Sequence, residues 1–489
     1  MAAASQTLPS YATWLSLGVF AAVVALLGGS SRPDPVQIVA LRPLAALAVF
    51  PALLWLTFEQ VRAHGFLVGL FAFTVAWMAL QLVPLPVSIW SSLPGRADIA
   101  AIDAIVGLEE HWRPISMVPT RGWNALAAMI VPAAALLLAI ASRANRTVLL
   151  QIIVALGGAN ALMGLLQAVV GGSGILSFYG QLRPEAPSGF FANENHSAVL
   201  CAITLMLSAK LVSADTNRAQ RRPFLIGYVA AFFLAFVAIL AGGSRAGLLC
   251  AAVALAASGY FVWERAQALR RQTDRQRTAR RLLDNPRFVT AMLAGGLLLA
   301  LVALYYLART PAFTELSNSG SIEELRWKVL PVLIDMARNF WLLGTGIGSF
   351  EEVYHIYEGT ELLGPKYLNH AHNDWLQLVI EGGLPAALAL GAFLAWWLWC
   401  ALRLARRKSA GRGEALFWIG LMAVVALASI VDYPLRTPLF QVIAMWFVLA
   451  LAATVRETDR GFIGDGPARS VKYGPRTERG PGQGERIYA

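Results

Sequence analysis

The amino-acid sequence predicts an all-α protein: a polytopic membrane bundle of about 12 transmembrane helices with one large periplasmic loop containing amphipathic helices. Two observations carry this prediction. Of the 489 residues, 57% are hydrophobic and only 14% are charged, whereas soluble domains have roughly 45–50% apolar and about 25% charged residues. Apolar stretches of about 20 residues also recur along the chain, and a helix needs that length to cross the hydrocarbon of a bilayer.

The apolar stretches define the predicted spans. No Lys or Arg precedes Arg32, so the first stretch is interpreted as a retained helix, because a cleavable signal peptide needs a basic start. The cysteines Cys201, Cys250 and Cys400 lie in or at the end of apolar runs and are expected to pack as small hydrophobic residues. The predicted spans are residues 11–30, 36–57, 66–83, 123–142, 148–170, 193–212, 223–241, 246–263, 288–308, 374–399, 415–431 and 437–455.

The basic residues predict the orientation of these spans. With a cytoplasmic N-terminus, the inner connections carry about 20 Lys and Arg in short loops, against about 12 in the longer outer segments. Residues 264–287 alone contain eight arginines. Both termini are therefore expected in the cytoplasm. The net charge of +11 follows this topogenic pattern, which makes nucleic acid an unnecessary partner.

Two outer connections are long, residues 84–122 and 309–373. In the second, Ser321 and Glu324 form a capping box that opens an amphipathic helix reaching about Phe340, with a bend expected at Pro331. The tail after Arg456 is rich in Gly, Pro and charge, and disorder is expected there. The predicted organisation is N-terminal spans over 1–170, a catalytic core over 171–440, and a last helix with its tail over 441–489.

Two arginines are candidates for binding an anion on the outer side. Arg245 lies in residues 242–247 (Gly-Gly-Ser-Arg-Ala-Gly), where small residues allow close helix packing and an arginine is costly unless paired or hydrated. Arg326 lies on the amphipathic helix. A guanidinium can grip phosphate through two parallel hydrogen bonds. The alternative for each is an interfacial or solvated arginine.

Histidines mark the start of the tenth span, in residues 369–374 (Asn-His-Ala-His-Asn-Asp). His372 can move a proton near neutral pH. Metal binding by His370 and His372 is a weaker alternative, because no further ligand is obvious. Asn373 or Asp374 is expected to cap the helix, and Gly382, Gly383 and Pro385 are expected to kink it.

The loop before the sixth span contains a further group of polar residues. It is interpreted either as a turn with a helix cap or as a loop that faces a sugar or diphosphate. In the second case the substrate-binding residues would be Arg183, Asn193, Asn195 and His196, with Asn373 joining them from the histidine segment.

Residues 344–348 (Gly-Thr-Gly-Ile-Gly) do not make a nucleotide site, because the complete glycine fingerprint and a strand–helix–strand context are both missing. Close backbone packing is the better interpretation. We expect no cofactor and no metal.

At these residues the chain resembles the O-antigen ligase-related family, over roughly residues 170–440. The family includes lipopolysaccharide O-antigen ligases, O-antigen and exopolysaccharide polymerases, and some protein O-oligosaccharyltransferases. Its Arg-x3-Leu pattern fits Arg326 with Leu330 and also Arg245 with Leu249. The motifs that carry the resemblance are residues 189–195, 242–247, 344–350, 370–376 and 381–385, with His372 and Gly383 matching a His-x10-Gly pattern.

The resemblance implies a multi-pass protein of the bacterial inner membrane that acts as a metal-independent glycosyltransferase. The donor would be a glycan on undecaprenyl diphosphate, and the acceptor a lipid A-core or a growing glycan. Arg245 and Arg326 would hold the diphosphate and stabilise its developing charge. His372 would orient or deprotonate the acceptor hydroxyl.

Ligase activity is favoured over polymerase activity, and protein glycosylation is a third possibility within the family. A transporter or flippase is the alternative from another class. Transporters often show internal repeats and broken helices near the midplane. This chain shows no repeat and concentrates its polar residues at the outer face, which favours an enzyme.

Overall fold

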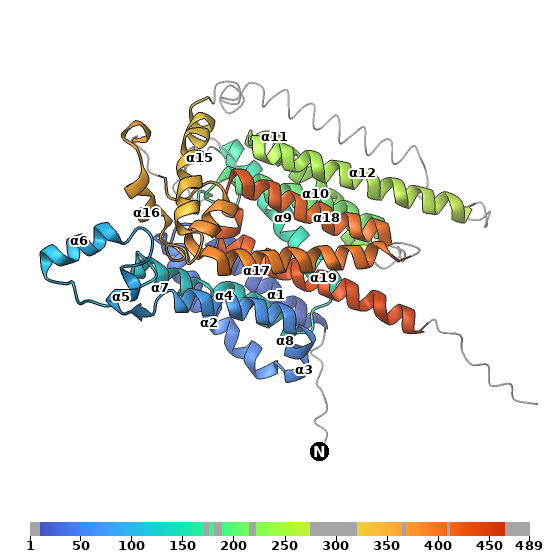
Figure 1. Cartoon of the computed structure of the whole chain (residues 1–489). Coiled ribbons are helices and arrows are strands. Elements are labelled where there is room, and N and C mark those ends of the chain that lie inside the picture. Colours follow the sequence, from blue (N-terminus) through green and yellow to red (C-terminus); the bar gives the residue numbers. More distant parts are fainter. Residues whose placement is uncertain are drawn as a thin grey trace, which may run out of the picture.

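The structure is a computed structural model that describes residues 10–170, 176–179, 188–214, 222–273, 320–363, 368–407 and 411–464. It is a bundle of long helices with shorter elements gathered at one end (Figure 1).

The first half of the chain contributes ten helices and two short strands within the described residues. They are α1 (Ser10–Leu27), α2 (Val36–Trp55), α3 (Phe58–Ala63), α4 (Gly65–Leu80), β1 (Pro84–Leu85), α5 (Val87–Trp90), α6 (Ala97–Val106), β2 (Arg113–Pro114), α7 (Pro119–Ala128), α8 (Ile130–Ala141), α9 (Arg146–Val170) and α10 (Glu194–Ala214).

The second half contributes six long helices and three short elements in the part that is described. They are α11 (Arg222–Gly242), α12 (Arg245–Thr273), α15 (Gly320–Phe340), α16 (Phe350–Tyr357), η2 (Thr360–Leu362), α17 (Asp374–Ala405), α18 (Gly411–Val431), η3 (Pro434–Arg436) and α19 (Pro438–Gly464).

Nine helical stretches of the described chain are long and apolar enough to cross a membrane, with α7 and α8 together forming one of them at Pro119–Ala141. Two shorter apolar helices, Tyr11–Leu27 and Gly65–Leu80, accompany them. Helices thus occupy every predicted span except that at residues 288–308, which lies outside the described residues. The polytopic all-α class is confirmed, and the count of twelve remains a prediction.

Several helices extend beyond the predicted spans. α12 continues to Thr273, ten residues past the expected end, and α17 and α19 also run further. Hydropathy marks where a segment leaves the hydrocarbon, whereas helical hydrogen bonding continues through good helix formers such as Ala, Leu, Gln and Arg. Part of the predicted arginine-rich loop is therefore helical.

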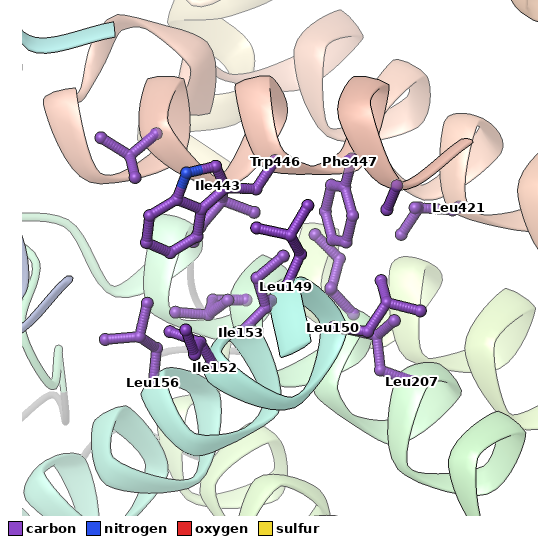
Figure 2. Close-up of a cluster of buried hydrophobic side chains, with 14 of the residues drawn as sticks. Leu149, Leu150, Ile152, Ile153, Leu156, Leu207, Leu421, Ile443, Trp446 and Phe447 are labelled. Carbon is purple, nitrogen blue, oxygen red and sulfur yellow. The ribbon is translucent and has the colours of Figure 1, made fainter. Parts of the chain in front are cut away.

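The core of the bundle is a large apolar cluster in which α9, α10, α18 and α19 meet (Figure 2). Leu149, Ile153 and Leu156 of α9 face Ile443 and Trp446 of α19 there. The three cysteines are buried and free, as expected for small apolar residues.

Close contacts between helices depend on small residues in this core. A Cβ on Gly157 would lie 1.7 Å from the Thr204 hydroxyl, and one on Gly158 would lie 3.2 Å from Ala231. Lipid chains are as apolar as leucine, so dense packing of this kind provides much of the association between membrane helices.

The short elements gather at one end of the bundle, which we call the loop end (left in Figure 1). β1 and β2 pair antiparallel there, beside α5 and α6. The predicted amphipathic helix is α15, whose Val329, Leu333 and Met336 are buried in a smaller apolar cluster with α16. The long outer connections 84–122 and 309–373 thus share one end of the molecule in their described parts.

Candidate functional site

A buried carboxylate, Asp432, lies directly after α18 at the loop end and is 1% exposed. Its backbone N–H still donates to the Ala428 carbonyl at 2.9 Å, so the side chain has a fixed position at the end of the helix. Pro434 cannot donate a helical hydrogen bond, and the chain turns there into η3.

Two asparagines from the start of α10 hydrogen bond to one oxygen of Asp432. Asn193 Nδ2 donates to Oδ2 at 3.2 Å, and Asn195 Nδ2 donates at 2.7 Å. Asn195 Oδ1 accepts in turn from the Ser244 hydroxyl at 2.7 Å, and Ser244 caps α12 by accepting from the backbone N–H of Gly247. The Asn-Glu-Asn and Gly-Gly-Ser-Arg motifs are therefore joined through side chains.

Histidines face the other oxygen, Asp432 Oδ1. The His372 Nδ1 atom lies 3.3 Å away and the His196 Nε2 atom 3.7 Å away, and the Tyr433 backbone N–H donates at 3.0 Å. Burial by itself would raise the pKa of Asp432, but the neighbouring imidazoles of His196 and His372 hold it well below the usual value. Asp432 is therefore an anion that can orient and stabilise a protonated imidazole.

The Tyr433 ring packs against all three histidines of this region. Its centroid lies 4.4 Å from that of His370, 4.8 Å from that of His372 and 5.2 Å from that of His196. The His196 side chain is 1% exposed, whereas that of His372 is 22% exposed. Of the two histidines beside Asp432, only His372 therefore has substantial access to a ligand.

His372 has a positive φ of 48°. Such a conformation is uncommon for a residue with a side chain and is often associated with functional sites. The next residue, Asn373, is the N-cap of α17 and accepts from the Leu376 N–H at 3.0 Å, as expected. The turn places the His372 Nδ1 atom 3.3 Å from Asp432 Oδ1 immediately before the helix begins.

A second charged group surrounds Arg436. Its Nε donates to Asp374 at 3.2 Å and its Nη1 to Glu381 at 3.0 Å, while Ser429 donates to the other Asp374 oxygen. The carboxylates raise the pKa of Arg436 against the effect of burial. Two helices and η3 are thus held together by a compensated network of buried charges.

Residues 344–350 support this network from the side. Glu381 Oε1 accepts from the backbone N–H groups of Gly348 and Phe350, both at 3.1 Å. A Cβ on Gly344 would lie 2.2 Å from the Glu381 carbonyl oxygen. The glycines therefore allow close backbone packing, which confirms the sequence interpretation, and the expected break of α17 occurs at Gly383 with φ 62°.

A cavity of about 590 Å³ opens beside the same segment. His370 and Asp374 line it, whereas His372 and Asp432 do not. The polar lining residues include Arg32, Arg42, Arg121, Asn124 and Arg436, and the apolar ones include Phe71, Met78, Leu136, Phe393, Trp397 and Val448.

The structure brings four of the predicted site residues together: His372, Asn193, Asn195 and His196 all surround Asp432. Arg245 follows Ser244 at the start of α12 and is exposed. Asn373 acts as a helix cap. The backbone of Arg326 lies in α15, but its side chain is outside the described part, as is the whole of Arg183.

Sequence reasoning missed Asp432, Arg436 and Glu381. A detectable signal was present, because Asp432 and Arg436 lie in a five-residue turn between two spans, and Glu381 lies within an apolar stretch. Ionisable residues in such places are costly unless they have partners. Within the described ranges there is no group of three His, Cys, Asp or Glu side chains that could hold a metal.

The many apolar spans and the network of buried charges at one end define a multi-pass membrane protein. Residues 230–391, which run from α11 into α17, match the model of the O-antigen ligase family. The match covers 162 of the 489 residues and includes Arg245, Arg326 and His372. This match supports an O-antigen ligase-related family for the chain. No curated protein sequence matches the chain.

Proposed function

We propose that this protein is a glycosyltransferase that moves a glycan from an undecaprenyl-diphosphate-linked donor to an acceptor hydroxyl at the periplasmic face, and that it acts as an O-antigen ligase. The family match supports the superfamily of ligases and polymerases. The observation that carries the proposal is the position of His372, whose Nδ1 lies 3.3 Å from the buried carboxylate of Asp432. Asp432 is in turn linked through Asn195 to Ser244, the residue before Arg245.

The histidine and carboxylate suggest a proton transfer. With its Nδ1–H directed at Asp432, the His372 imidazole keeps a lone pair on Nε2. That lone pair takes the proton from the acceptor hydroxyl while the hydroxyl oxygen bonds to the anomeric carbon of the donor. The bond from this carbon to the diphosphate breaks, and the diphosphate leaves with the electron pair. Arg245 and Arg326 stabilise its charge, and Asp432 stabilises the imidazolium.

The proposal requires that the loop end is periplasmic, as the Lys and Arg distribution predicts. Reporter fusions at residues 275 and 470 should then report the cytoplasm, and a fusion at residue 345 should report the periplasm. A cytoplasmic signal at residue 345 would contradict the proposed site.

Transfer by the purified protein provides the direct test. A lipid-linked glycan is offered with two acceptors in parallel, lipid A-core and a second lipid-linked glycan. Transfer to lipid A-core indicates a ligase, and chain extension indicates a polymerase. Chelator is expected to leave the activity unchanged, and activity that is lost and then restored by a divalent ion would contradict the metal-independent mechanism. Movement of the lipid without any new glycosidic bond would instead support a transporter.

A further inference from the structure

His196 is a buried histidine to which the proposed reaction assigns no step. It lies near the start of α10, and its side chain is 1% exposed. Both ring nitrogens are buried and have no hydrogen-bond partner among the described residues. A buried polar group is costly without a partner, so the position of this imidazole needs an explanation.

Aromatic rings enclose the His196 imidazole, and one carboxylate faces it. The rings of Phe191, Tyr433 and Phe440 stand nearly perpendicular to the imidazole, with centroids 6.1, 5.2 and 6.4 Å away. The His196 Nε2 atom lies 3.7 Å from Asp432 Oδ1, and no other carboxylate of the described chain lies within ion-pair distance. This carboxylate favours the tautomer that carries its proton on Nε2.

The Oδ1 atom of Asp432 has more donors around it than it can satisfy. A carboxylate oxygen has two lone pairs, and the Tyr433 backbone N–H occupies one of them at 3.0 Å. His372 Nδ1 at 3.3 Å and His196 Nε2 at 3.7 Å both face what remains. The other oxygen, Oδ2, already accepts from two asparagine amides. Two imidazoles therefore share one lone pair of one anion.

We propose that His196 is a positioning residue that shares Asp432 Oδ1 with His372 and thereby regulates when His372 is available as a base. This inference rests on the proposed role of His372. The N–H of His196 offsets part of the negative charge of Asp432, so that less of this charge stabilises a proton on His372. His372 therefore remains neutral down to a lower pH than it would beside Asp432 alone.

The transfer itself reverses the preference of the carboxylate. Once His372 has taken the proton from the acceptor, its charged N–H binds Oδ1 more strongly than the neutral N–H of His196 does. A charge on both imidazoles at once would leave two cations on one buried anion, which is unfavourable. Only one of the two histidines is therefore expected to be charged at a time.

The other titratable and charged groups around His196 stay the same in every variant below. The segment 188–193 and α19 contribute only the apolar rings of Phe191 and Phe440 next to it. The titratable and charged groups are Asp432 and Tyr433 after α18, Arg436 in η3, His370, His372 and Asp374 beside the start of α17, and Glu194 on α10 itself.

Reaction of the full-length protein with diethyl pyrocarbonate, followed by mass spectrometry, tests this inference without a transfer assay. The reagent attacks an unprotonated imidazole nitrogen, so the labelling rate of His372 against pH reports where this histidine gains its proton. The His372 side chain is 22% exposed, although its Nδ1 is buried, and the buried His196 is protected. His111 is exposed and serves as an internal reference.

Three variants of His196 separate its N–H from its shape. His196→Leu suits the aromatic surroundings and removes the donor, so the midpoint of His372 labelling should move to higher pH by about 0.5–1 unit, as expected for one net hydrogen bond. His196→Met is a second side chain without a donor and should give the same shift. His196→Gln places an amide N–H near the position of Nε2 and should restore the wild-type midpoint. His111 should keep its midpoint throughout.

His370→Gln is the matched control. The His370 ring packs against the same Tyr433 ring at 4.4 Å, but its hydrogen-bond partner is Gln377. This variant should leave the midpoint of His372 labelling unchanged. Transfer rates between pH 5 and 8 give a second readout, in which the acid limb should move in the same direction and by the same amount as the labelling midpoint.

Equal labelling midpoints in wild type and in both variants without a donor would overturn the inference. Equal shifts in the Leu and Gln variants would also overturn it, because they would show that His196 only fills space. The inference and the proposed function fail separately. If His372→Ala still transfers, the proposed base is wrong, whereas a shifted midpoint would still show the shared carboxylate. If His372→Ala is inactive and the midpoint is unshifted, the base stands and the role of His196 is wrong.

Discussion

The packed core and the loop end of this bundle use opposite chemistry. Around Ile153 and Trp446 the helices meet through apolar and small side chains, and glycines such as Gly157 set their separation. Around Asp432 the helix ends are joined through carboxylates, amides and imidazoles. Buried polar groups are costly without partners. The core thus provides the framework, and the loop end is where we expect the chemistry.

This contrast predicts different effects for variants of the two regions. Changes at the loop end should reduce transfer in a protein that still folds, and changes in the core should reduce stability in a protein that still transfers.

The largest effect is expected from His372→Ala. It should abolish transfer while donor binding largely survives, because the arginines rather than the imidazole hold the diphosphate. His370→Ala is the matched control and should retain substantial activity, since His370 lines the cavity and its hydrogen-bond partner is Gln377 rather than Asp432. Glycan transfer and donor binding are measured separately at matched membrane levels. An active His372→Ala protein, or an inactive His370→Ala protein, would overturn the assignment of the base.

Asp432→Asn should reduce transfer by about 10²-fold or more, because the amide has nearly the same shape but cannot stabilise an imidazolium. Donor binding and the melting temperature should change much less. The comparison variant is Asp335→Asn on the exposed face of α15, which should transfer normally. Equal transfer by Asp432→Asn and wild type would show that the carboxylate is only structural.

The arginines should give a smaller loss. Arg245→Lys and Arg326→Lys are expected to be impaired as well as the Ala variants, by roughly tenfold, because a lysine ammonium cannot form a bidentate pair with phosphate. Arg338→Lys is the control. Wild-type transfer in correctly inserted Lys and Ala variants would mean that these arginines are interfacial.

The core prediction concerns stability. Gly157→Val should lower the free energy of unfolding by about 1–3 kcal/mol, because even a Cβ would collide with Thr204. Transfer per folded molecule should remain near wild type. Gly69→Val is the control, since nothing lies within 4 Å of a Cβ at Gly69. A Gly157→Val protein of normal stability and poor transfer would contradict the division between core and loop end.

The smallest effect is a pH dependence of stability at His370. Burial first, then the positive charges of Arg436 and His372, lower its pKa well below 6.5. As the pH falls below 6.5, the unfolded chain gains a proton that the folded chain does not, so stability is lost by at most about 1.4 kcal/mol per pH unit. The other ionisable groups near His370 are His196, Asp374, Glu381 and Asp432, and they remain in the variant.

Melting temperatures of wild type and His370→Gln between pH 5 and 7.5 measure this term. The variant should lose less stability than wild type as the pH falls. Parallel curves for the two proteins would show that His370 titrates as in the unfolded chain.

Much of the fold could be predicted because it depends on local properties. Runs of about 20 apolar residues can satisfy their backbone groups in lipid only as helices, and helices occupy the predicted spans that fall in the described chain. The ends of the helices were harder to predict, as α12 shows, because helix propensity changes little between the apolar span and the polar residues that follow it. Local backbone chemistry predicted a cap at Asn373 or Asp374 and a kink at Gly382, Gly383 and Pro385, and the structure has the cap at Asn373 and the break at Gly383.

The composition of the site depended on the tertiary structure. His372 and the asparagines at the start of α10 stood out as polar residues beside spans. Their shared partner, Asp432, lies in the turn after α18, 60 residues beyond His372 and 239 and 237 residues beyond Asn193 and Asn195. The pairing of Arg436 with Glu381 is likewise decided by which helices pack together. Sequence alone determined a membrane bundle with cations and a base beside its spans, since the free energy of moving a segment from water into lipid depends on that segment by itself. Only the packing decided which charges are compensated, because the energy of a buried charge depends on partners distant in sequence.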